Sequence, residues 1–140
     1  MANVDPIDFT RAVEGLNPEE TLFIINSKTF TTAETMLNAK TCRKWLLDHY
    51  AAKGVDVAQE GGKIVNSHFC ACSTNLPETS KFGISDEERV FAFWDWVGGR
   101  FSVSSCIGIL ALSFHFGYEY TRGFLDGMHS IDQNVNKKNI

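Results

Sequence analysis

Residues 21–35 read TLFIINSKTFTTAET, and this stretch decides the fold. Residues 22–25 are an unbroken apolar run, which is typical of a strand buried on both faces of a parallel sheet. A polar loop follows at residues 26–29. Thr31 and Glu34 then have capping-box spacing, which predicts a helix with Thr31 as its N-cap and Glu34 reaching back. The stretch therefore predicts a strand that feeds a helix through a short polar loop.

A loop of this kind can bind an anion. The first amides of a helix have no partner within the helix and favour negative charge. Lys28 adds a full positive charge. Hydroxyl donors are also available from Ser27, Thr29, Thr31 and Thr32. The loop is therefore a candidate site for a phosphate monoester, although Ser and Thr at a helix start are commonly no more than caps. The glycines and the Lys-Ser/Thr pair of a nucleotide P-loop are missing from it.

Composition limits the class of protein. The chain has 140 residues, 44% of them hydrophobic and 21% charged, as expected for one globular domain with a core of its own. The net charge of −4 argues against nucleic acid or an anionic membrane as the main partner. No apolar run reaches the about 18 residues that a bilayer span needs, and the N-terminus does not resemble a signal peptide. We therefore expect a cytoplasmic protein.

The four cysteines do not have the spacing of a zinc site. They are Cys42, Cys70, Cys72 and Cys106, without paired CxxC motifs. Their apolar surroundings predict buried, reduced thiols. We expect no metal.

The rest of the chain alternates helical and strand patterns. Helices are expected from Pro6, with Asp5 as the cap, to near Gly15, over residues 32–50 and 76–82, over 103–116 with Ser102 as the cap, and over 118–131. Strands are expected over residues 64–74 and 90–93. Residues 51–62 contain three glycines and predict a surface loop, and residues 134–140 predict a fraying tail.

A second informative stretch is WDWVGGR at residues 94–100. Paired glycines let a backbone approach a ligand closely, and an arginine suits phosphate or an oxyanion. The alternative is an ordinary glycine turn with Arg100 on the surface. The order of elements predicts an α/β fold with a mostly parallel sheet. Right-handed crossovers would then place residues 27–32 and 98–100 on one rim of that sheet.

The motif SKTFTTAET at residues 27–35, followed by FWDWVGGRFS at residues 93–102, resembles the glucose-6-phosphate isomerase family. The resemblance extends over nearly the whole chain and implies one sugar isomerase domain, a three-layer αβα sandwich, over residues 1–140. The family interconverts glucose 6-phosphate and fructose 6-phosphate in glycolysis and gluconeogenesis without a cofactor or metal. The longer enzyme is expected to be a homodimer.

The resemblance also implies roles for individual residues. Ser27, Lys28, Thr29 and Thr32 would hold the phosphate of the substrate, with Thr31 and Gly99 close to it. Arg100 would stabilise the enediol(ate) intermediate. The family's base, ring-opening histidine and late lysine fall after the last residue of this sequence, and a Gly-Ser turn falls before its first. We therefore expect one part of a two-domain enzyme that is inactive alone.

Two other functions stay open at this stage. One is a non-catalytic sugar-phosphate-binding module and the other is a purely structural remnant. Single histidines without a placed partner rarely act as acid or base, so His68, His115 and His129 are expected to be structural. Glu34 is assigned to the capping box and Glu119 to an exposed helix face.

Overall fold

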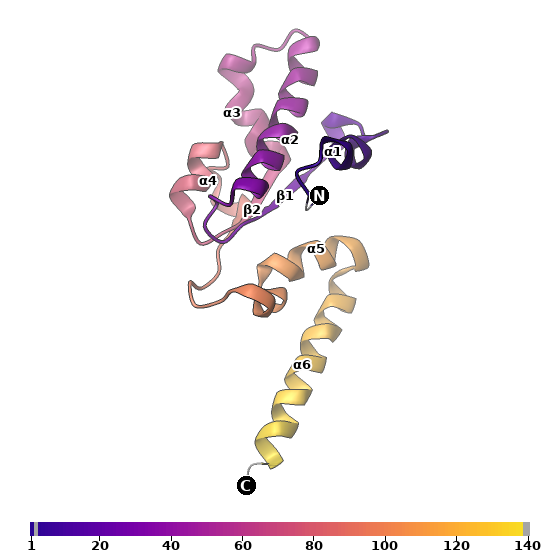
Figure 1. The fold of residues 1–140 in the computed structure, drawn as a ribbon, viewed down its shortest axis with the longest axis vertical. Coiled ribbons are helices and arrows are strands. Elements are labelled where there is room, and N and C mark those ends of the chain that lie inside the picture. Colours follow the sequence, from indigo (N-terminus) through magenta and orange to yellow (C-terminus); the bar gives the residue numbers. More distant parts are fainter. Residues whose placement is uncertain (2, 139–140) are drawn as a thin grey trace. The chain divides into compact units, whose positions relative to one another are not determined.

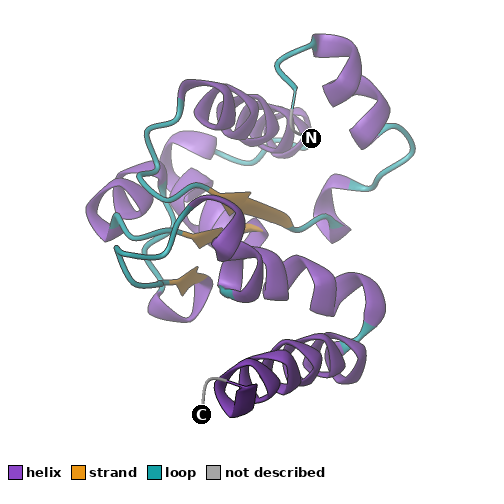
Figure 2. Cartoon of the chain, turned by 60° about the horizontal axis from the view of Figure 1, so that its bottom comes forward, coloured by secondary structure: helices purple, strands orange, loops and turns teal. Residues whose placement is uncertain are grey.

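The computed structural model describes residues 1 and 3–138. Its elements divide between two compact units, Met1–Asp95 and Trp96–Ile140, and each unit is treated separately below. Figure 1 shows the elements in chain order, and Figure 2 separates helices from strands. The first unit contains α1 (Pro6–Val13), η1 (Pro18–Glu20), β1 (Phe23–Asn26), α2 (Ala33–Ala52), α3 (Val57–His68), β2 (Phe69–Cys72), α4 (Leu76–Phe82), η2 (Glu87–Arg89) and β3 (Val90–Phe91).

The three strands form one parallel sheet in the order β1-β2-β3, which confirms the predicted α/β class. Phe23 pairs with Phe69, and Ala71 pairs with Val90. Every residue of the central strand β2 is buried, as expected where a parallel sheet is covered on both faces. In β1 only Ile25 is buried, and the preceding Leu22 is exposed, so the expected burial on both faces is wrong for this outer strand.

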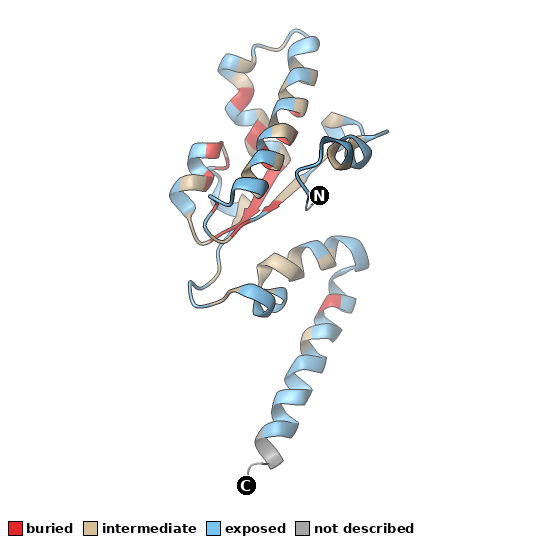
Figure 3. Cartoon of the chain, viewed as in Figure 1, coloured by how far each residue is buried: buried red, intermediate tan, exposed pale blue. Residues whose placement is uncertain are grey.

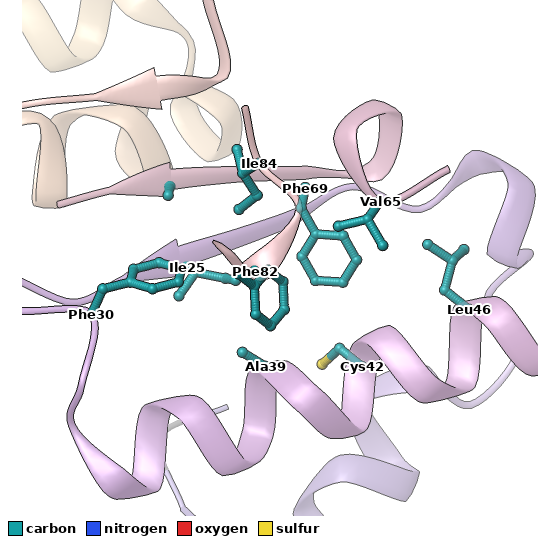
Figure 4. Packing of buried hydrophobic residues seen from close by; sticks show 10 residues of the cluster. Ile25, Phe30, Ala39, Cys42, Leu46, Val65, Phe69, Phe82 and Ile84 are labelled. Atoms are coloured by element: carbon teal, nitrogen blue, oxygen red, sulfur yellow. The ribbon is translucent and has the colours of Figure 1, made fainter. Parts of the chain in front are cut away.

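The core of the first unit lies where α2 packs on the sheet (Figure 4). Ala39, Cys42 and Leu46 repeat at helical spacing and are all buried. The Phe69 ring stacks on Phe23 with centroids 4.8 Å apart, which anchors the sheet side of this core. In Figure 3 the buried residues of the first unit lie mainly on the sheet, α2, α3 and α4. The sheet and its loops are therefore supported by a packed hydrophobic core.

The region predicted as a loop, residues 51–62, contains the start of a helix. The Asp56 side chain accepts a hydrogen bond from the Ala58 amide at 2.9 Å and begins α3. Gly61 is buried, and a Cβ there would lie 3.7 Å from Leu47 of α2. The glycine therefore permits close helix packing instead of ending the helix. As a result the strand predicted over residues 64–74 is reduced to Phe69–Cys72.

Other elements of the first unit agree with prediction. Asp5 caps α1 through the Ile7 amide at 2.9 Å, and Gly15 follows that helix with φ 75°. The predicted helix over residues 76–82 is α4, and Gly83 ends it in the left-handed region. The third strand is shorter than predicted and stops at Phe91.

The second unit contains η3 (Gly99–Ser104), α5 (Cys106–Phe116) and α6 (Tyr118–Lys138). Ser105 caps α5 by accepting from the Ile107 amide at 3.3 Å, so the expectation that Ser102 is the cap was wrong. The predicted buried helix is also wrong, because no residue of α5 is buried. Within its unit α5 packs only against η3 and α6, which leaves Phe114 and Phe116 exposed.

Helix α6 continues past the predicted end near Ile131 and reaches Lys138. The predicted fraying of the tail concerns in part residues 139–140, which lie outside the described residues. Over its described length α6 is mostly exposed (Figure 3), and Thr121 is its one buried residue. No helix within the described ranges has the length and apolar character that a membrane span requires.

Candidate functional site

The loop between β1 and α2 is a tight turn fixed from inside. The Ser27 amide donates to the Cys72 carbonyl at 3.1 Å, which continues the pairing of β1 with β2. The buried Ser27 hydroxyl accepts from the Phe30 amide at 3.1 Å. Phe30 has φ 55°, which is rare for a residue with a side chain, and its ring is buried in the core. The loop therefore keeps one conformation because a core aromatic holds it there.

Residues that follow β2 anchor the loop between β1 and α2 through hydrogen bonds. The Lys28 carbonyl accepts from the Thr74 amide at 2.9 Å, the Thr74 hydroxyl at 2.8 Å and the Ser73 hydroxyl at 3.0 Å. The Asn75 amide group donates to the Thr29 carbonyl at 2.9 Å. The carboxyl ends of β1 and β2 thus form one polar rim, which is where ligands bind in open parallel sheets.

The predicted capping box is absent. Helix α2 begins at Ala33, its N-cap is Thr32, and the Thr32 side chain makes no capping hydrogen bond. The Thr31 hydroxyl donates instead to the Thr29 hydroxyl at 2.8 Å, and Thr32 accepts from Ser27 at 3.4 Å. The loop hydroxyls are therefore linked in two pairs, Thr31 with Thr29 and Ser27 with Thr32, and the structure shows no capping hydrogen bond from Glu34 among the described residues.

Lys28 is the cation of this loop, and its partner is Asp95. The ammonium group donates to the Asp95 carbonyl, and it lies 3.5 Å from the Asp95 carboxylate. The Asp95 side chain is 94% exposed, so this ion pair is a surface pair that contributes at most about 1 kcal/mol. A stronger anion at the rim could replace it.

Gly99 and Arg100 belong to the second unit. Gly99 has φ 56° at the start of η3, and the Ser102 hydroxyl donates to its carbonyl at 2.7 Å. Arg100 is exposed and makes no hydrogen bond or ion pair within the described residues. Its position beside the loop of residues 27–32 stays a prediction.

Two residues of the site escaped sequence analysis. Phe30 is an apolar residue inside a polar loop, and that contrast was the available signal for its anchoring role. Asp95 lies between two tryptophans of the second motif, where its charge is the signal for a lysine partner. Both lie inside motifs that were noticed for other residues.

His68 and the buried cysteines have structural explanations. His68 contacts the Tyr50 hydroxyl at 3.0 Å and the Thr21 carbonyl at 2.8 Å, as expected for a structural histidine. All four cysteines are free thiols, and Cys42, Cys70 and Cys72 are buried. Burial raises the pKa of Cys42 to about 11 and also raises the pKa of Cys70. Neither thiol suits nucleophilic chemistry near neutral pH.

Comparisons with known proteins agree on one family. The family model described as phosphoglucose isomerase matches residues 1–140. The chain is 51% identical to cytosolic glucose-6-phosphate isomerase 1 of Clarkia xantiana and 52% identical to cytosolic isomerase 2A of Clarkia lewisii. Each alignment covers 100% of this chain and 23% of the relative. The chain therefore spans about a quarter of the length of these relatives.

Solved structures give the same result. The crystal structure of a glucose-6-phosphate isomerase from Chlamydia trachomatis matches with a TM-score of 0.68 at 33% identity, over 94% of this chain and 23% of that one. A hypothetical protein from Thermus thermophilus matches with a TM-score of 0.59 at 28% identity, over 80% of this chain and 25% of that one.

Proposed function

Because the chain belongs to the phosphoglucose isomerase family, we propose that it forms part of a glucose-6-phosphate isomerase and supplies the phosphate-binding loop. The observation that supports this most directly is the loop of residues 27–32. It joins a parallel strand to the uncapped start of α2, and residues 73–75 hold it at the carboxyl rim of the sheet. The same loop carries Lys28.

The phosphate of the sugar binds at the start of α2 in this proposal. Helix amides and the macrodipole favour the anion, and Lys28 supplies the full charge. Ser27, Thr29 and Thr32 contribute hydroxyl donors, with Thr31 at the edge of the bound sugar. Because Phe30 and Asn75 already fix the backbone, little ordering is needed when the ligand binds.

Arg100 acts on the intermediate, and Gly99 lets the backbone approach the sugar. Isomerisation moves a proton between C2 and C1 through an enediol(ate), so negative charge develops on oxygen. A fixed guanidinium lowers the energy of that charge. The base and the ring-opening group come from polypeptide outside these 140 residues, within the longer two-domain enzyme. That enzyme is a homodimer in this proposal, and its cytosolic location agrees with that of the Clarkia relatives.

Calorimetric titration of glucose 6-phosphate into the 140-residue chain tests the loop. Lys28→Ala should weaken binding roughly 10- to 100-fold, because a hydrogen bond to a charged group contributes about 1.5–3 kcal/mol. Lys44→Ala is the matched control, since Lys44 pairs with Asp48 on the surface of α2 and does not belong to the loop. Equal affinities for the wild type and Lys28→Ala would refute the assignment.

A coupled assay for the formation of fructose 6-phosphate distinguishes an incomplete enzyme from a complete one. The chain alone should not convert glucose 6-phosphate, because proton transfer needs a positioned base of suitable pKa. Turnover at ordinary enzyme rates would show that the catalytic groups are all present here. A non-catalytic binding module would bind the ester equally well, so binding alone does not distinguish it from part of an enzyme. Activity of this chain within a longer isomerase distinguishes the two.

A further inference from the structure

A groove of about 660 Å³ lies along the facing surfaces of α2 and α4, beside the phosphate-binding loop. Its size is within the range of small-molecule sites. Phe30 and Thr31 of that loop line it, whereas Lys28 and Ser27 do not, so it adjoins the loop without containing the loop's cation or innermost hydroxyl. The residues that matter for its chemistry are Phe30, Met36, Lys40, Arg43, Lys81 and Phe82.

Part of the groove's wall is apolar and rigid. Phe30 and Phe82 are both core residues, and their rings meet edge to face with centroids 5.8 Å apart. Figure 4 shows the two rings lying between the sheet and α2. Met36 adds a flexible apolar side chain on the α2 side. Phe30 and Phe82 are only 2% and 9% exposed, so the apolar surface open to a ligand comes mainly from Met36 and from Leu37, which is 53% exposed.

The charged residues of the groove are mainly positive. Lys40, Arg43 and Lys81 line it against a single carboxylate, Glu78, which already pairs with Lys81. This excess occurs in a chain whose net charge is −4. The groove therefore has a local potential opposite in sign to the whole molecule, and such a concave site concentrates anions.

The Arg43 side chain is held at the wall of the groove. Its guanidinium carbon lies 5.9 Å from the centroid of the Phe82 ring, which fixes the group at the groove. Its Nε is fully buried and has no hydrogen-bond partner among the described residues. Because Nε is covered by protein atoms, a ligand in the groove would have to meet the terminal nitrogens of the guanidinium.

We propose that this groove binds a small organic anion, with an apolar ring or short chain against Met36 and Leu37 and an acidic head at Lys40 and Arg43. The acidic head can be a carboxylate, a sulfonate or a phosphoryl group, because all three accept hydrogen bonds from a guanidinium. The site shares Phe30 and Thr31 with the phosphate-binding loop, but its cations are Lys40, Arg43 and Lys81, and neither Lys28 nor Arg100 lines it.

The test uses 2-naphthalenesulfonate, which has an apolar ring and one negative charge but no phosphate. It is titrated into the full 140-residue chain and followed by two-dimensional amide NMR. We expect saturable binding, with shifts centred on residues 30–43 and 78–82. The double variant Lys40→Gln/Lys81→Gln should bind at least about tenfold more weakly, since the charge-assisted contact of Lys40 is lost and the positive charge of the groove falls by two. The uncharged 2-naphthalenesulfonamide should also bind more weakly.

The control variant is Lys44→Gln/Lys63→Gln, which removes the same charge from surface residues outside the groove and should keep full affinity. Lys28→Ala should also keep it. The proposal is overturned if binding does not saturate, if both double variants lose affinity equally, if shifts fall only in the second unit, or if Lys28→Ala abolishes binding.

Discussion

The ammonium group of Lys28 has two acceptors on Asp95, the main-chain carbonyl and the carboxylate. In the proposed function the phosphate of a sugar takes the place of that carboxylate. Asp95 then acts as a competitor for the lysine that keeps it at the rim between binding events. Its side chain is nearly fully exposed, so it can move into solvent at little cost.

Asp95→Asn should therefore strengthen the binding of glucose 6-phosphate by about 1.4- to fivefold, because an exposed ion pair contributes only about 0.2–1 kcal/mol. Calorimetry on the folded variant measures the change, and Asp48→Asn serves as the control at another exposed pair. Weaker binding by Asp95→Asn would mean that the carboxylate positions Lys28 and does not compete with the ligand.

Cys42 makes stability sensitive to alkaline pH. Burial raises its pKa from 9.0 to about 11, so the folded state keeps the proton after the unfolded state has lost it. The stabilisation is complete below pH 9 and is lost as the pH rises through 11. Between pH 8 and pH 10 the free energy of unfolding should fall by roughly 1 kcal/mol more in wild type than in Cys42→Ala. Urea unfolding at both pH values measures this, and identical changes in the two proteins would refute it.

At the scale of elements, Gly108 determines how closely α5 approaches the preceding turn. A Cβ at this position would lie 2.1 Å from the Val103 carbonyl oxygen, so the backbone would have to move. Gly108→Ala should destabilise α5 by about 1–3 kcal/mol despite the better helix propensity of alanine. Hydrogen exchange of the α5 amides measures the loss.

Gly123 in α6 is the matched control. A Cβ there meets no atom within 4 Å, so Gly123→Ala should stabilise its helix by about 1 kcal/mol through propensity alone. If Gly108→Ala and Gly123→Ala change the stability of their helices alike, the close approach at Gly108 does not affect stability.

Features set by neighbouring residues were predicted correctly from the sequence, whereas features set by tertiary contacts were missed. Asp5 with Pro6 and Gly83 after α4 are local signals, and both helix ends were predicted correctly. Helix α3 was missed because Gly61 and Gly62 suggested a loop. The packing of Gly61 against Leu47 is a tertiary contact that no local pattern contains. The apolar run of α5 predicted burial, yet burial depends on the partners of a helix and not on its composition alone.

For the site, residues 27–32 were predicted as a loop at a helix start, and that arrangement is present. The details differ because a hydroxyl group can donate to any of several nearby acceptors. Thr31 bonds to Thr29 and not to a helix amide, so the capping box was wrong although the residue types fit it. The anchoring of the loop by Ser73 and Thr74 needed the pairing of β1 with β2, which brings distant residues together.

At the scale of the whole molecule, the proposed function needs more polypeptide than these 140 residues, since the relatives are about four times as long. A chimera tests this directly. The matching segment of the Clarkia xantiana cytosolic isomerase is replaced by this chain, and the chimera should be active. Arg100→Ala in it should lower kcat by about 100-fold or more, because a fixed donor to a developing oxyanion is lost.

Arg122→Ala is the control for that experiment, since Arg122 is another exposed arginine of the second unit. It should leave kcat unchanged. An inactive chimera that is folded and still binds the sugar phosphate would favour the non-catalytic binding module. An active chimera in which Arg100→Ala keeps its kcat would remove Arg100 from the mechanism.

The central claim is that the loop of residues 27–32 and the start of α2 hold the phosphate of a sugar. The most direct measurement is a two-dimensional amide NMR titration of the 140-residue chain with glucose 6-phosphate. The account predicts saturable shifts that are largest at the amides of residues 27–35 and that disappear in Lys28→Ala. Shifts that leave these amides unchanged, or that persist equally in Lys28→Ala, would contradict it.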